Sequence, residues 1–234
     1  MRDDGTMRTL ARSRAGSRAG LLARSLAAAG ALLVLAGCGS ASAPSPPAGV
    51  DGLVIPTPDP RAADFVAGLD NPWFPAAAGA RWELVDPATG ATALTLTTEP
   101  GPEVDGIATT RVVRTAADGT AVGDLYAQDR AGNVWWFGRE GEWLAGDDGA
   151  EAGLAMPARP RRGDGFRTTS AGLAEIATVT AFDEEVTVPL ATYRRTVTVE
   201  IEAASGATRT EVYARGVGPV RIGDLALAAH EPAP

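Results

Sequence analysis

From Arg81 onward, apolar and polar residues alternate with a period of two, and turn-forming residues interrupt this pattern at short intervals. The alternation is clearest over residues 196–202, where Val197, Val199 and Ile201 fall on one face and threonine and glutamate on the other. A strand with one apolar and one polar face is typical of an antiparallel sheet that is buried on one side. We therefore expect strands at 82–85, 92–98, 108–115, 121–128, 134–137, 142–145, 166–169, 175–182, 193–202, 208–214 and 220–227.

These strands predict a mainly β fold, with one domain over residues 61–230. About ten antiparallel strands with short links would form a curved meander, which is compatible with a barrel, a half-barrel or a sandwich. A short N-terminal helix is expected before the sheet, because Asp59 is a preferred helix cap, Pro60 suits the first helical position and Gly68 suits the end. Residues 231–234 are expected to form a tail.

The N-terminal residues have the pattern of a signal peptide. Residues 1–25 carry six arginines against two aspartates, and residues 26–37 are uncharged and mostly apolar. A helix of about twelve residues spans roughly 18 Å, which is well short of the ~30 Å hydrocarbon core of a bilayer. Residues 1–37 are therefore interpreted as a cleaved leader, and both Met1 and Met7 are compatible with its start.

The leader ends in Leu35, Ala36, Gly37 and Cys38, which resembles the lipobox of bacterial lipoproteins. In that family a diacylglycerol is attached to the cysteine sulfur, and the signal peptidase cuts before the cysteine. The resemblance implies a lipid anchor with acyl chains such as palmitate on Cys38, and a domain held at the extracytoplasmic side of the cell membrane. The alternatives are a plain secretory signal that ends near Ala43, or an ordinary buried cysteine.

The composition beyond the leader restricts the partners of the domain. Residues 38–60 follow the cysteine with six prolines among small residues, which is typical of a tether rather than a folded element. Beyond residue 37, acidic residues outnumber arginines by 27 to 15, and this negative charge disfavours nucleic acid and anionic headgroups as partners. We therefore expect membrane contact through the acyl chains of Cys38 alone.

Few residues in the chain are suited to catalysis. His230 is the only histidine, so histidine triads and multi-histidine metal sites are excluded, and no glycine-rich phosphate loop is present. The acidic pairs Asp147–Asp148 and Glu184–Glu185 consist of adjacent residues, whose side chains point to opposite faces of a strand, and we expect them in solvated turns. We predict no catalytic residue, cofactor site or metal site, and favour a protein that is not an enzyme.

Aromatic residues are the best candidates for ligand or partner contacts. Trp135 and Trp136 are adjacent, so we expect one to face the core and the other to face away from it. An outward tryptophan requires cover from another segment, a partner or a ligand. The candidate contact residues are Trp73, Phe74, Tyr126, Trp135, Trp136 and Trp143.

Several motifs together resemble a family of uncharacterised bacterial exported proteins. They are DNPWFP at 70–75, ARW at 80–82, YAQDRAGNVWWFG at 126–138, MPA at 156–158, VPLATY at 188–193 and YARGVGPV at 213–220. The resemblance covers roughly residues 70–222 and implies no particular activity. The last two motifs are also loosely similar to envelope lipoproteins in which a curved antiparallel sheet surrounds a helix, some of which bind lipids.

Three hypotheses for function follow. The first is a non-catalytic binding or structural module of the cell envelope, in contact with an envelope protein. The second is a carrier of an apolar or lipid-like ligand on the concave face of the sheet, which a cavity lined by aromatic residues would favour. The third is an extracellular hydrolase, which would require two carboxylates about 5–10 Å apart in a cleft. The sequence does not indicate an oligomeric state.

Overall fold

The computed structural model describes residues 61–169 and 175–234, which fall within one compact unit spanning Gly49–Pro234. The leader, the Pro-rich tether and the lipobox residues Leu35, Ala36, Gly37 and Cys38 lie outside the described residues.

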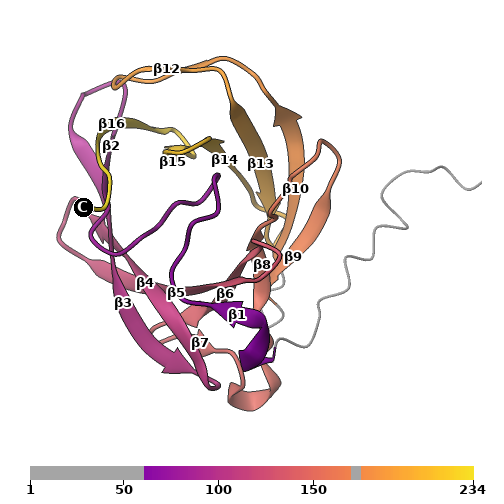
Figure 1. Cartoon of the computed structure of the whole chain (residues 1–234). Coiled ribbons are helices and arrows are strands. Elements are labelled where there is room, and N and C mark those ends of the chain that lie inside the picture. The colour runs from indigo at the N-terminus through magenta and orange to yellow at the C-terminus, as the bar shows by residue number, and fades with distance from the viewer. Residues whose placement is uncertain (1–60, 170–174) are drawn as a thin grey trace, which may run out of the picture. The chain divides into compact units, whose positions relative to one another are not determined.

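The described residues form sixteen strands, fourteen of which belong to one large antiparallel sheet (Figure 1). The prediction of a mainly β, antiparallel fold is confirmed. The strands are β1 (Phe65–Val66), β2 (Arg81–Val85), β3 (Thr92–Val104), β4 (Ile107–Ala116), β5 (Ala121–Asp129), β6 (Val134–Arg139), β7 (Trp143–Leu144), β8 (Gly153–Met156), β9 (Gly165–Thr169), β10 (Glu175–Phe182), β11 (Val186–Thr187), β12 (Thr192–Tyr193), β13 (Thr196–Glu202), β14 (Thr208–Ala214), β15 (Gly218–Ile222) and β16 (Leu225–Glu231). Two short 3-10 helices, η1 (Ala62–Asp64) and η2 (Asp147–Gly149), complete the elements.

Strands that follow one another in sequence are mostly neighbours in the sheet, in the order β7-β6-β5-β4-β3-β2-β16-β15-β14-β13-β10-β9. The pairing of β2 with β16 places Trp82 opposite His230, so two distant parts of the chain are adjacent. β8 pairs with β6, and an isolated bridge joins Ala152 to Thr169 of β9. Figure 1 shows the sheet curving until its two halves face each other, although the paired strands of the described residues do not form a complete ring.

Two-residue turns explain both a correct and an incorrect strand prediction. Between β3 and β4, Asp105 and Gly106 have φ values of 49° and 75°, as a tight hairpin turn requires. The expected single strand at 220–227 was wrong, because Gly223 turns the chain with φ of 57° and Ile222 pairs with Leu225 across a second tight hairpin.

The start of the described chain also differs from expectation. Of the expected helix, Asp59 and Pro60 lie outside the described residues, and the remainder forms only η1 followed by β1. Phe65 of β1 pairs with β5 and packs edge-on against Phe137, with ring centroids 5.1 Å apart. Pairing with Gln128 and Asp129 of β5, beyond the last residue that β4 pairs, satisfies this backbone more completely than one isolated helical turn. At the other end, β16 continues to Glu231, so His230 lies within a strand.

The segment after β1 turns back inside the curve of the sheet (Figure 1) and is fixed there by Asn71, which is 1 % exposed. The Asn71 Oδ1 atom accepts hydrogen bonds from the backbone N–H groups of Trp73, at 2.8 Å, and Phe74, at 3.2 Å. Its Nδ2 atom donates to the carbonyl oxygens of Gly132, at 2.8 Å, and Pro157, at 3.3 Å. A fully paired buried amide of this kind holds one backbone path.

Two distant hairpins hold the same segment. Gln128 of β5 accepts hydrogen bonds from the backbone N–H groups of Asp70 and Asn71 through its Oε1 atom, at 3.0 and 2.8 Å. On the opposite side, the N–H group of Gly216 donates to the carbonyl oxygen of Pro72 at 2.6 Å. The segment therefore bridges the two halves of the sheet and presents Phe74 to the space between them.

Candidate functional site

A cavity of about 280 Å³ lies on the concave side of the sheet, with walls from both halves of the sheet and from the segment after β1. This volume is close to the lower end of the range of small-molecule pockets, about 300–1,000 Å³. The aromatic residues in its wall are Phe74, Trp82, Tyr126, Trp136 and Tyr213. The charged residues in its wall are Arg114, Asp124, Arg139, Glu175, Arg209 and Glu211.

The aromatic part of the wall is a contiguous cluster. The ring of Phe74 lies 5.0 Å from that of Tyr126 and 6.2 Å from that of Tyr213, measured between centroids. Trp136 packs edge-on against Trp143 at 5.0 Å, and the guanidinium carbon of Arg139 lies 5.3 Å from the centroid of the Trp136 ring. These rings offer an apolar surface that an apolar ligand could cover.

One charged pair lies deep in the wall. The side chain of Asp124 is 1 % exposed, and its Oδ1 atom accepts a hydrogen bond from Arg139 Nε at 2.8 Å. The two residues face each other across the β5–β6 pairing. Arg139 is 31 % exposed and also lies 3.9 Å from Glu142, so this cluster extends from the interior toward solvent. A carboxylate so deeply buried depends on its charged partner.

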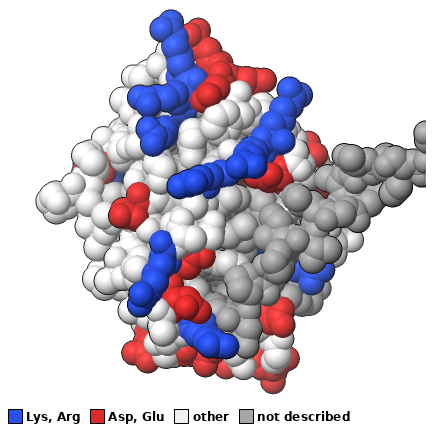
Figure 2. Space-filling model, turned by 45° about the vertical axis from the view of Figure 1, so that its right-hand side comes forward, with Lys and Arg blue, Asp and Glu red and all other residues white. Residues whose placement is uncertain are grey.

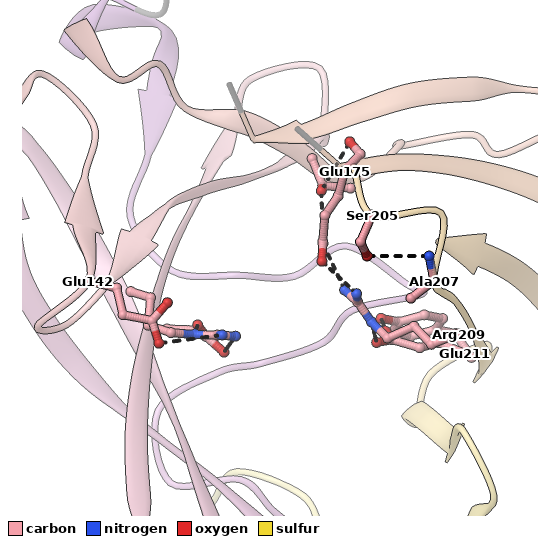
Figure 3. A network of polar contacts seen from close by, with 10 residues as sticks. Glu142, Glu175, Ser205, Ala207, Arg209 and Glu211 are labelled. Atoms are coloured by element: carbon pink, nitrogen blue, oxygen red, sulfur yellow. Dashed lines mark hydrogen bonds and ion pairs between the residues drawn. The ribbon is translucent and has the colours of Figure 1, made fainter. Parts of the chain in front are cut away.

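A second cluster lies on the opposite strands, and Figure 3 shows its side chains pointing toward one another. Arg209 of β14 binds both carboxylate oxygens of Glu175 in β10, at 2.7 and 2.9 Å. The same guanidinium donates through Nε to Glu211 Oε1 at 3.2 Å. The Tyr213 hydroxyl donates to the other oxygen of Glu211. Planar, two-pronged pairing of this kind fixes the geometry of an arginine more strictly than a single contact.

Burial controls the protonation of this wall. It raises the pKa of Tyr126 and of Tyr213 far above the usual range, and neighbouring carboxylates add to both shifts. Burial also acts to raise the pKa of Glu175, but the hydrogen bond and charge of Arg209 outweigh it, and the pKa is lowered overall. The phenols are therefore neutral donors at neutral pH, and Glu175 is ionised.

The six aromatic candidates from the sequence separate into two groups. Phe74, Tyr126 and Trp136 line the cavity. Trp73 and Trp135 are in the hydrophobic core, at 6 % and 3 % exposure, and Trp143 packs edge-on against Trp136 without lining the cavity itself. The adjacent tryptophans do point to different sides: Trp135 donates through Nε1 to Asp129 Oδ2 at 2.9 Å.

The charged residues of the wall were not found by sequence reasoning. The sequence drew attention to adjacent acidic pairs, and the structure places Asp147, Asp148, Glu184 and Glu185 on the surface, as predicted. The informative signal was instead a charge two residues from an aromatic in the same strand, as in Asp124–Tyr126 and Glu211–Tyr213. Residues spaced by two share one face of a strand, so these pairs enter the same space.

Outside the cavity, charges of both signs are mixed. The face in Figure 2 shows arginines next to acidic residues rather than one large patch of either sign. Within residues 61–169 and 175–234, no group of three or more histidine, cysteine or acidic side chains is arranged to hold a metal ion. In the same part of the chain, no helix has the length and apolar character needed to cross a bilayer.

Comparison of the chain with known protein families, curated proteins and solved structures finds no match. The function is therefore argued from the geometry of the cavity.

Proposed function

We propose that this protein is a lipid-anchored binding module of the cell envelope that carries an apolar-bodied small molecule in the cavity of its sheet. The observation that supports this most directly is the cavity of about 280 Å³, walled by Phe74, Trp82, Tyr126, Trp136 and Tyr213. Covering the accessible part of these aromatic rings with an apolar ligand is favourable by about 25 cal/mol per Å² of apolar surface removed from water.

The state of the carboxylates favours binding over catalysis. Asp124, Glu175 and Glu211 are each held by an arginine, and the pKa of Glu175 is lowered rather than raised. A general acid near neutral pH needs the opposite shift, toward a raised pKa. The geometry therefore supports a carrier more than the hydrolase hypothesis.

The anchor in this proposal is Cys38, with Leu35, Ala36 and Gly37 as the recognition residues before it. The negative charge beyond residue 37 gives no second attraction to anionic headgroups, so the acyl chains would provide all of the membrane affinity. Cys38→Ala should shift the protein from the membrane fraction to the soluble fraction on cell fractionation. A Cys38→Ala protein that stays in the membrane fraction would contradict the anchor.

The carrier itself is tested by native mass spectrometry of the full-length Cys38→Ala chain, which needs no detergent that could fill the cavity. Purified from its own host, the protein should carry an added mass that is lost on denaturation. The control is Ala155→Trp, which places a large side chain in the cavity wall and should abolish the added mass while circular dichroism stays unchanged. Absence of any added mass in the unsubstituted cavity would count against the carrier.

A further inference from the structure

Every oxygen of the cavity-wall carboxylates already accepts a hydrogen bond. The two oxygens of Asp124 accept from Arg139, at 2.8 and 3.4 Å. Those of Glu175 accept from Arg209, and those of Glu211 accept from Arg209 and the Tyr213 hydroxyl. A ligand that offers donors would compete with these charge-assisted bonds, which are stronger than neutral hydrogen bonds.

The indole N–H group of Trp136 is an unpaired donor. The Nε1 atom of Trp136 is fully buried and has no hydrogen-bond acceptor among the described residues. A buried N–H group without an acceptor costs about 1–3 kcal/mol. The Trp136 ring lines the cavity, but a nitrogen with almost no accessible surface is closed to a ligand as well as to water, so it is not counted among the groups that bind a head group.

Two further donors belong to the same wall. Tyr126 lies directly opposite Trp136 in the β5–β6 pairing, and its hydroxyl makes no hydrogen bond within the described part of the chain. Arg114 of β4 also lines the cavity, and its guanidinium has no ion-pair partner within that part of the chain. Arg114 lies opposite Val122 in the β4–β5 pairing, so it shares the wall with Tyr126, four residues further along β5.

We propose that the cavity selects an apolar molecule with an anionic head group, such as a carboxylate, which Arg114 and Tyr126 bind. This proposal rests on the proposed carrier function and adds the chemistry of the ligand. Among the described residues, Arg114 is the one arginine of the wall without an ion pair, so it is the cation that an anionic head would meet. A cationic head would be repelled by Arg114, and a neutral head leaves the Arg114 charge unpaired in a partly buried wall.

The size of the cavity also limits the ligand. At about 30 Å³ per molecule of liquid water, 280 Å³ corresponds to roughly nine waters. A short-chain amphiphile fits this space better than a complete two-chain phospholipid. Octanoate, octanol and octylammonium have the same tail and differ in head charge, so they isolate the contribution of the head.

The test is isothermal titration calorimetry of the full-length Cys38→Ala chain with these three probes. Octanoate should bind at least about tenfold more tightly than octanol, and octylammonium should bind most weakly. If none of the three binds, the carrier proposal fails with this one. If octanol or octylammonium binds as tightly as octanoate, the carrier stands and the anionic-head proposal is overturned.

Variants locate the head group. Arg114→Gln should weaken octanoate binding by about tenfold or more and leave octanol binding within about twofold. Arg167→Gln is the matched control, because Arg167 of β9 carries the same charge on the exposed face of the sheet. Tyr126→Phe removes one donor and should weaken octanoate binding by about threefold to tenfold. Equal octanoate affinity in the Arg114→Gln and Arg167→Gln proteins would overturn the proposal.

Discussion

Two regions on either side of β6 contain buried polar groups, which are hydrogen-bonded in one region and include an unpaired donor in the other. Around the turn after β5, Asn71, Gln128, Asp129 and Trp135 satisfy one another and the local backbone. On the cavity side of the same strand, the N–H group of Trp136 has no acceptor among the described residues. The contrast indicates that the first region stabilises the fold through its hydrogen bonds, whereas the second carries the free-energy cost of an unpaired buried donor.

The largest expected effect is in the satisfied region. Asn71→Ala removes four hydrogen bonds and leaves buried backbone groups without partners, so it should lower the free energy of unfolding by about 3 kcal/mol or more. Urea denaturation followed by tryptophan fluorescence measures this. Asp86→Ala is the control, because Asp86 makes a similar bond to a backbone N–H in an exposed turn and should cost less than about 1 kcal/mol. Equal losses in both proteins would refute the stabilising role of Asn71.

Arg139 and Arg114 of the cavity wall should differ next in their effect on stability. Arg139→Met leaves the buried Asp124 carboxylate unpaired and should cost about 2–3 kcal/mol of stability. Arg114→Met breaks no ion pair among the described residues and should change stability by less than about 1 kcal/mol. Thermal melts of the two variants compare them directly. A larger loss for Arg114→Met would mean that Arg114 supports the fold rather than the ligand.

The pH dependence of stability should report the Glu175–Arg209 pair. The pKa of Glu175 is lowered in the folded protein, so the unfolded chain binds the proton more tightly. Stability from this pair is therefore complete above the ordinary value of 4.5 and is lost as pH falls through the lowered value. Glu175→Gln should flatten the acid limb of a plot of unfolding free energy against pH, while Glu202→Gln, on the exposed side of β13, should not. Identical acid limbs in the two variants would contradict the pairing.

The smallest effect is expected at the adjacent tryptophans. Trp135→Phe breaks the 2.9 Å bond to Asp129 and should cost about 1–2 kcal/mol, beyond the change in packing. Trp136→Phe removes a donor that has no acceptor in the described structure. Its cost in unfolding free energy should therefore be at least about 0.5 kcal/mol smaller than that of Trp135→Phe. Both are measured by chemical denaturation without ligand. The reverse order would show that Trp136 is structural.

Much of the sheet was predictable because alternation is a local property. The strands around Val197, Leu96 and Val112 follow from their period-two pattern and the turns that flank them. The tight hairpin at Gly223 carried the right signal, since a Gly-Asp pair between two strands predicts a two-residue turn. Strand β8 was missed, because Pro157 follows it directly and its four residues are too few to show a period.

The candidate site was only partly predictable. Alternation assigned Tyr126 and Trp136 each to one face of a strand, but it did not decide whether that face pointed into the curve of the sheet or away from it. Arg209 and Glu175 lie 34 positions apart and meet only because β10, β13 and β14 are consecutive in the sheet. The role of a charged residue on a strand depends on which residue lies opposite it on the neighbouring strand.

The sequence by itself determined the β class and the positions of most strands, and it predicts the leader and the Cys38 anchor, because these depend on residues close together in the chain. Only the tertiary structure decided that Trp136 lines a cavity and Trp135 lies in the core, and that Asp124, Glu175 and Glu211 pair with two arginines while Arg114 has no ion pair among the described residues. These outcomes depend on the curvature of the sheet and on the path of the segment held by Asn71, which bring distant residues together. Local pattern fixes which groups a strand presents, and long-range packing fixes which of them remain unpaired.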